Sequence, residues 1–145
     1  MRDFPCNARL SEPVYSLSAG KFLNKINLFG KLTENWDGHG AAMPNRQTLA
    51  NARKFINELI AKEDVLLENL DIENITPTPY GTIVFDWEID KNIVSVEIGD
   101  TKIGFFTDFA NNGNNIISEG EIFNERKLPE NLKQAFRILF EEIYA

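Results

Sequence analysis

Apolar and polar residues alternate along most of the stretch from position 82 to 109, and this pattern leaves few folds open to the chain. Large apolar side chains occupy every second position from Ile83 to Ile89, and the alternation returns around Val96 and Phe105 after short turns. A period of two is typical of half-buried strands. Because parallel strands need crossover connections of about a dozen residues or more, such short turns predict antiparallel neighbours in a meander.

The alternation also predicts the register of the strands. Pairing Phe85 with Val96, and Val96 with Phe105, places the large apolar residues on one face, and a slip of one residue would turn them into water. The segment 75–79 fits only an edge, because its two prolines lack the N–H groups that a central strand donates. The same register predicts that acidic residues share the opposite face with Lys102, namely Asp86, Glu88, Glu97, Asp108, Glu119 and Glu121.

Helical patterns precede and follow the strands. Apolar residues spaced by three and four predict a helix over 19–37 and a second helix that starts after Asn45, its expected N-cap, and ends near residue 63. Residues 65–70 could add a short extra turn. A terminal helix should open at Pro129, because proline is favoured at the first helical position.

These elements predict an α+β domain. It has two N-terminal helices, a four- to five-stranded antiparallel meander and a C-terminal helix packed on one face of the sheet. We expect residues 1–18 to form an extended arm and residues 19–145 to form a single domain. A chain of this length buries about 68–70% of the surface that its unfolded form exposes, so one hydrophobic core can hold it.

The residue counts exclude several classes of protein. With one cysteine, Cys6, and one histidine, His39, the chain can form neither an intramolecular disulfide, nor a cysteine-based zinc site, nor a site with two histidine ligands. No apolar run approaches the roughly 18 to 20 residues that span a bilayer, and the opening residues lack an apolar signal core. We therefore expect a cytoplasmic protein that holds no metal or cofactor and binds no membrane.

Charge is distributed unevenly along the chain. The formal net charge is -7, from 15 basic and 22 acidic residues, but residues 1–62 carry a net +4 and residues 63–145 a net -11. Free nucleic acid should be repelled, because sequence-independent binding to it depends on lysine and arginine. A protein partner with a basic surface fits the acidic sheet face better. The contact candidates are Asp86, Glu88, Glu97 and Glu119, together with Phe106, which alternates onto the same face.

The main interpretation is therefore a non-enzymatic acidic binding protein of the immunity, antitoxin or anti-defence type. The acidic residues could instead hold Mg²⁺ or Ca²⁺, but they are spread across a meander rather than gathered at converging loops. A third interpretation is a structural module of a larger assembly. The oligomeric state stays open at this point.

An enzyme is the alternative, and it would be centred on the loop of residues 35–44. Asp37 and His39 stand there beside two glycines, and a carboxylate can orient an imidazole whose ordinary pKa lies nearest neutral pH. That pair could serve a small hydrolase or a nucleic-acid-processing enzyme. The structural alternative is that Asp37 and Gly38 end the first helix while Trp36 fills the core and His39 is exposed. No Gly-x-Ser-x-Gly elbow and no G-x-G-x-x-G phosphate loop is present.

Two motifs in the chain have an unusual composition. They are Asn35-Trp36-Asp37-Gly38-His39-Gly40-Ala41 with Pro44, Thr48, Ala52 and Phe55, and Pro77-Thr78-Pro79-Tyr80-Gly81-Thr82-Ile83 with Asp86-Trp87-Glu88. They resemble a family of small uncharacterised bacterial proteins, whose members show a Trp-Asp-Gly-x-Gly-Ala loop, a helix, a Pro-x-Pro-x-Gly turn and a strand. The resemblance covers about residues 22 to 123 and implies a bacterial or mobile-element origin, with two helices before a meander, but it implies no activity and no catalytic residue.

Overall fold

The computed structural model describes the backbone of residues 13–62, 64–109, 117–121 and 130–144, and the side chains within 20–61, 65–109 and 130–140. The α+β class and the helix at the C-terminal end are as predicted. The elements in chain order are α1 (Pro13–Phe29), α2 (Arg46–Lys62), α3 (Asp64–Glu68), the 3₁₀ turn η3 (Ile72–Asn74), β1 (Ile75–Pro77), β2 (Ile83–Ile89), β3 (Asn92–Ile98), β4 (Lys102–Asp108), β5 (Ile117–Glu121) and α4 (Glu130–Tyr144).

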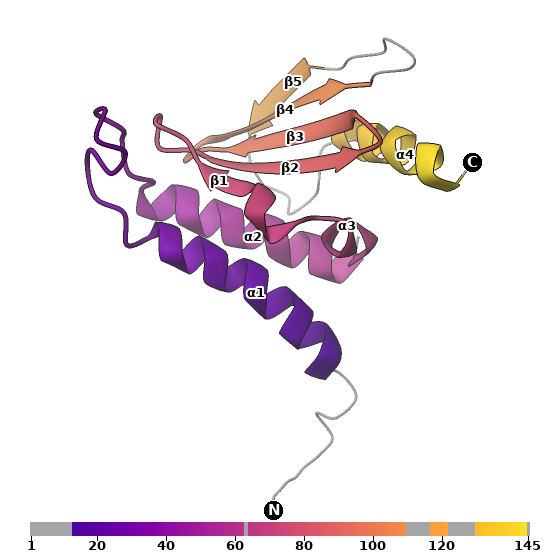
Figure 1. The fold of residues 1–145 in the computed structure, drawn as a ribbon, viewed down its shortest axis with the longest axis horizontal. Coiled ribbons are helices and arrows are strands. Elements are labelled where there is room, and N and C mark those ends of the chain that lie inside the picture. The colour runs from indigo at the N-terminus through magenta and orange to yellow at the C-terminus, as the bar shows by residue number, and fades with distance from the viewer. Residues whose placement is uncertain (1–12, 63, 110–116, 122–129, 145) are drawn as a thin grey trace, which may run out of the picture.

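The five strands form one antiparallel meander in the order β1-β2-β3-β4-β5 (Figure 1). Phe85 pairs with Val96, and Val96 pairs with Phe105, so the predicted register is confirmed. Strand β1 lies at an edge, where its proline needs no ladder partner on the open side. The alternation of large apolar residues along β2, β3 and β4 therefore decides which face of the sheet is buried.

Helices α2 and α4 pack on the buried side, which we call the inner face; the opposite side is the outer face. The ring of Phe55 on α2 lies 5.0 Å from that of Phe85 and 6.2 Å from that of Trp87. Phe136 on α4 approaches Trp87 to 4.8 Å, again edge to face. Edge-to-face pairs at these distances add about 0.5–1.5 kcal/mol each to the gain from burial. Trp87 thus joins both helices to the sheet.

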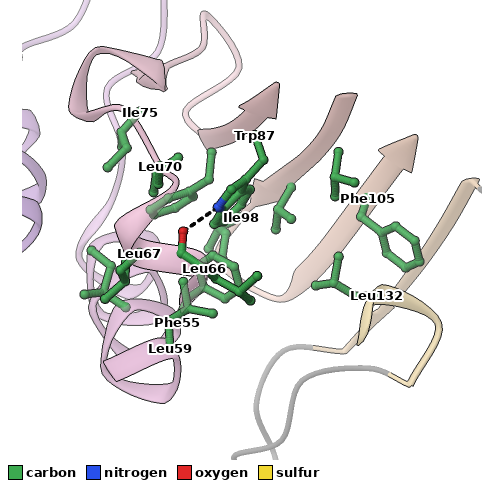
Figure 2. Packing of buried hydrophobic residues seen from close by; sticks show 14 of the residues in the cluster. Phe55, Leu59, Leu66, Leu67, Leu70, Ile75, Trp87, Ile98, Phe105 and Leu132 are labelled. Atoms are coloured by element: carbon green, nitrogen blue, oxygen red, sulfur yellow. Dashed lines mark hydrogen bonds between the residues drawn. The ribbon is translucent and has the colours of Figure 1, made fainter. Parts of the chain in front are cut away.

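The short helix α3 closes the core beside Trp87. The indole Nε1 of Trp87 donates a hydrogen bond of 2.7 Å to the backbone oxygen of Leu66, so the one polar atom of this buried ring is paired (Figure 2). Leu66, Leu67 and Leu70 are buried against the same cluster. The extra turn expected over residues 65–70 is confirmed as α3.

The predicted bounds of the first helix were wrong. Helix α1 spans Pro13–Phe29 instead of residues 19–37, so residues 13–18 of the expected arm are helical. Residues 1–12 lie outside the described part of the chain. Pro13 is the first helical residue, a position where its fixed φ and its missing N–H cost nothing.

The end of α1 departs from the prediction for a different reason. Gly30 donates its N–H to Asn27 across only three residues, which tightens the last turn and ends the α-helix. Asn35 has a φ of 63°, in the left-handed region that no right-handed helix contains. Leu32 and Trp36 keep a helical spacing from α1, yet both are half-buried residues of a loop. Trp36 therefore does not fill the core.

The second helix follows its prediction closely. Asn45 is the N-cap, because its Oδ1 accepts the backbone N–H of Thr48 at 2.8 Å. The apolar residues spaced by three and four along α2 are buried at Leu49, Ala52, Phe55, Ile56 and Leu59, and half-buried at Ile60.

Helix α4 has an apolar stripe of the same kind. Its described members Leu132, Phe136 and Leu139 are buried.

Candidate functional site

The outer face of the sheet holds the contact candidates that the alternation predicted. The described helices lie on the inner side, where Phe55 and Phe136 contact Trp87. The side chains at the strand positions between the buried ones, such as those next to Phe85 and Val96, therefore form the outer face. Its described members are Thr76, Val84, Asp86, Glu88, Ile93, Ser95, Glu97, Lys102, Gly104, Phe106 and Asp108.

Of the four predicted acidic residues whose side chains the structure describes on this face, three are exposed. Glu88, Glu97 and Asp108 are exposed, and Asp86 is half-buried. Phe106 stands among them with 43% of its surface exposed, although it is a large apolar residue. The outer face thus combines negative charge with an exposed aromatic ring.

The last strand contributes two further positions to the same face. In the register of β4 and β5, Glu119 pairs with Gly104 and Glu121 pairs with Lys102. The side chains of both glutamates lie outside the described part of the chain. Their positions in the ladder agree with the predicted alternation.

Acidic and apolar residues are interleaved on the outer face. Ile93 stands directly between Glu88 and Asp108 in neighbouring strands, and Val84 stands directly opposite Glu97. Among the described residues of this face, no two acidic ones are directly opposite each other. Since like charges in that position destabilise a sheet, this spacing lets the sheet carry several carboxylates. The acids of this face were predicted from the sequence, whereas the presence of Val84 and Ile93 among them was not.

Asp86 differs from the other described acids of this face, because one of its carboxylate oxygens is buried. Its Oδ1 atom is buried and accepts no hydrogen bond from any residue that the structure describes. Asp86 lies in one row with Ser95 and Phe106 across three strands. A buried acceptor without a donor costs about 1–3 kcal/mol, so this oxygen of Asp86 lowers the stability of the sheet.

Glu97 is held in place by a chain of hydroxyl groups. The Oγ1 of Thr82 donates to Glu97 Oε2 at 2.6 Å. Thr82 and Thr78 hydroxyls are also 2.6 Å apart, and because the single hydrogen of Thr82 is given to Glu97, Thr78 is the donor in this second bond. Thr78 Oγ1 accepts the N–H of Tyr80, which folds the turn of residues 78–82. One acidic group of the outer face is therefore fixed by the turn before β2.

The second candidate locus, Asp37 and His39, is built differently from a catalytic pair. Asp37 Oδ1 accepts the backbone N–H groups of His39 at 2.8 Å and of Ala41 at 3.1 Å. The contact between the two residues is thus made through the backbone of His39. The imidazole is exposed and has no hydrogen bond or ion pair with the described residues. Asp37 holds the loop in shape.

The loop and the turn that carry the two family-like motifs lie side by side. Ala42 donates its N–H to the backbone oxygen of Pro79 at 2.8 Å and forms an isolated parallel bridge with Tyr80. Gly81 has a φ of 81°, and a Cβ there would lie 3.2 Å from the backbone oxygen of Met43. Only glycine allows both this conformation and this approach. Both motifs could be recognised in the sequence, but no pattern in it predicted the contact between them.

The described residues hold no group of three histidine, cysteine, aspartate or glutamate side chains that could bind a metal ion. Within the same part of the chain, every helix is too short or too polar to cross a membrane. A scan against protein-family models, a search of curated proteins and a search of solved structures gave no match. A functional proposal for this chain therefore depends on its own geometry and charge.

Proposed function

We propose that the chain is a non-enzymatic binding protein whose outer face captures a protein with a basic surface. The observation that carries the proposal is the group of exposed Glu88, Glu97 and Asp108 around the exposed Phe106. The resemblance noted above supports a bacterial or mobile-element origin. An immunity, antitoxin or anti-defence protein of the cytoplasm is the kind of protein that such a surface suits.

The physical case for a basic protein partner has two parts. Carboxylates that face lysine and arginine across an interface raise the association rate and reject partners of the wrong sign. An aromatic side chain near the centre supplies the apolar contact area that exposed ion pairs lack. Phe106 has Ser95 directly opposite, Glu97 diagonally adjacent on β3 and Asp108 two residues along β4, so its ring can enter a pocket while the acids contact a basic rim.

The fixed position of Glu97 supports the same proposal. Immobilising a flexible side chain on binding costs about 0.5–1.5 kcal/mol. Since Thr82 already holds the Glu97 carboxylate, part of that cost is met before a partner arrives. A net charge of -7 disfavours free nucleic acid as the partner.

Affinity capture with matched variants tests the proposal. The purified chain is used as bait in extract from its source cell, alongside Glu88→Lys/Glu97→Lys and a control, Glu68→Lys/Glu73→Lys. The control changes the net charge equally at two exposed acids outside the sheet. We expect a protein with a basic surface to be retained by the wild type and the control and lost from the outer-face variant. Equal retention by all three would remove the outer face as the binding surface.

A further inference from the structure

A second charged surface lies on the first two helices. Its charges are basic on both helices, and the one acidic side chain described on them, Glu58, is half-buried. We call this surface the helix face. Lys21, Arg46 and Lys54 are exposed on it, Lys25 and Arg53 are half-buried, and the exposed Lys31 in the turn directly after α1 extends it.

The helix face and the outer face lie on opposite sides of the molecule. At about 100° per residue, Arg46 and Arg53 lie about 180° and 160° around α2 from Phe55, which contacts the inner face of the sheet. Arg53 donates to Asn27 of α1 at 3.2 Å, so the exposed sides of the two helices meet. Figure 1 shows α2 between the sheet and α1. The basic and acidic surfaces therefore point away from each other.

The two faces match in charge, in apolar content and in size. The outer face exposes Glu88, Glu97 and Phe106, and the helix face exposes lysines around Leu28, which is 56% exposed. Strands of seven residues and helices of 17 residues are both about 25 Å long. Five strands about 4.8 Å apart, and two helices each about 10 Å across, make both faces about 20 Å wide. A contact between them would therefore bury about 1,000 Å² in total, at the low end for specific interfaces.

We infer that the chain binds a second copy of itself head to tail, with the outer face of one copy seated on the helix face of the next. Copies with a net charge of -7 repel at a distance, so only the orientation that brings the two faces together is favourable. Because the faces lie on opposite sides, the contact leaves a free face at each end and can repeat. The complex should be weak, reversible and open-ended.

Sedimentation velocity of the purified full chain measures this directly. At about 10 mM ionic strength, where the Debye length is about 30 Å, we expect the average mass to rise steadily with concentration above the 16.5 kDa of the monomer. At about 1 M, where the Debye length is about 3 Å, the mass should return to that of the monomer.

Neutralising variants identify the faces. Glu88→Gln/Glu97→Gln and Lys21→Gln/Lys31→Gln should each weaken the association about five- to tenfold, since each removes two exposed ion pairs. The matched controls are Glu68→Gln/Glu73→Gln and Lys91→Gln/Lys133→Gln, which change the net charge equally and should leave the association unchanged. The four residues changed in these two controls lie outside both faces.

Mixing the two face variants is the decisive step. One variant keeps only an intact helix face and the other only an intact outer face, so together they form one interface and no more. We expect the mixture to reach twice the 16.5 kDa of the monomer and stop there.

Several results would overturn the inference. A monomer at low ionic strength and high concentration would do so, and so would association that both face variants retain. A mixture that stays monomeric, or a monomer whose helix face binds a DNA duplex instead, would also contradict it. The inference shares the outer face with the proposed function but fails separately, because it is tested on the purified chain alone and the proposed function needs a foreign protein.

Discussion

The hydroxyl of Thr82 donates to the Glu97 carboxylate at 2.6 Å, and this bond joins the turn before β2 to the outer face of the sheet. The same turn is bonded to the loop of residues 35–44 through Ala42 and Pro79. The two loci that the sequence suggested are thus parts of one continuous network. A change in the loop can reach Glu97 through the turn, whereas the side chains of Glu88 and Asp108 have no hydrogen bond to the described residues.

Replacing Thr82 with valine tests this connection. Thr82→Val removes the hydroxyl that links Thr78 and Glu97, and we expect the free energy of unfolding to fall by about 1 kcal/mol. Urea unfolding followed by circular dichroism measures the change. Thr82→Ser keeps the hydroxyl and should lose less than half as much. Equal stability of Thr82→Val and wild type would mean that the bond contributes nothing.

The role of Asp37 is separated from that of His39 by three variants. Asp37→Ala removes the acceptor of two backbone N–H groups and should lower the free energy of unfolding by about 1–2 kcal/mol. Asp37→Asn retains an oxygen at that place and should recover at least half of the loss. His39→Ala changes an exposed ring and should stay within about 0.5 kcal/mol of wild type. A His39→Ala variant as unstable as Asp37→Ala would contradict a loop-stabilising role for Asp37 alone.

Asn45 gives a prediction about the start of α2. Its Oδ1 caps Thr48, and its Nδ2 donates to Asp100 Oδ2 at 3.1 Å. Asn45→Ala loses both bonds and should cost about 1 kcal/mol of unfolding free energy, as cap removal typically does. Asn45→Ser keeps a capping oxygen but cannot reach Asp100 in the same way, so it measures the cap alone. Thermal unfolding of the three proteins gives the comparison.

The sheet could be predicted from the sequence because alternate positions of a strand point to opposite faces. A residue pair such as Phe85 and Val96 must lie on the buried side, and a one-residue slip has a large cost. That argument also placed Glu97 and Phe106 on the outer face. The same parity places Val84 and Ile93 there as well, but only the acids and Phe106 were singled out from the sequence.

The end of α1 could not be predicted in the same way. Leu32 and Trp36 continue the helical spacing and both are half-buried, but they reach their places from a loop. Apolar spacing reports which side chains approach the core but not the backbone that carries them, and the turn after α1 brings Leu32 against the core as a helix would. The contact of Ala42 with Pro79 joins residues far apart in the chain, and no local sequence pattern predicts it.

Asp86 gives a prediction about the free-energy cost of one buried carboxylate oxygen. Its buried Oδ1 has no donor among the described residues, and aspartate is a poor strand former. Asp86→Thr should therefore raise the free energy of unfolding by about 1 kcal/mol, measured by urea unfolding. Glu88→Thr is the matched control, since it removes the same charge from the same face of the same strand at an exposed position. We expect the control to stay within about 0.5 kcal/mol of wild type. If Asp86→Thr is no more stable than Glu88→Thr, the buried oxygen of Asp86 carries no free-energy penalty.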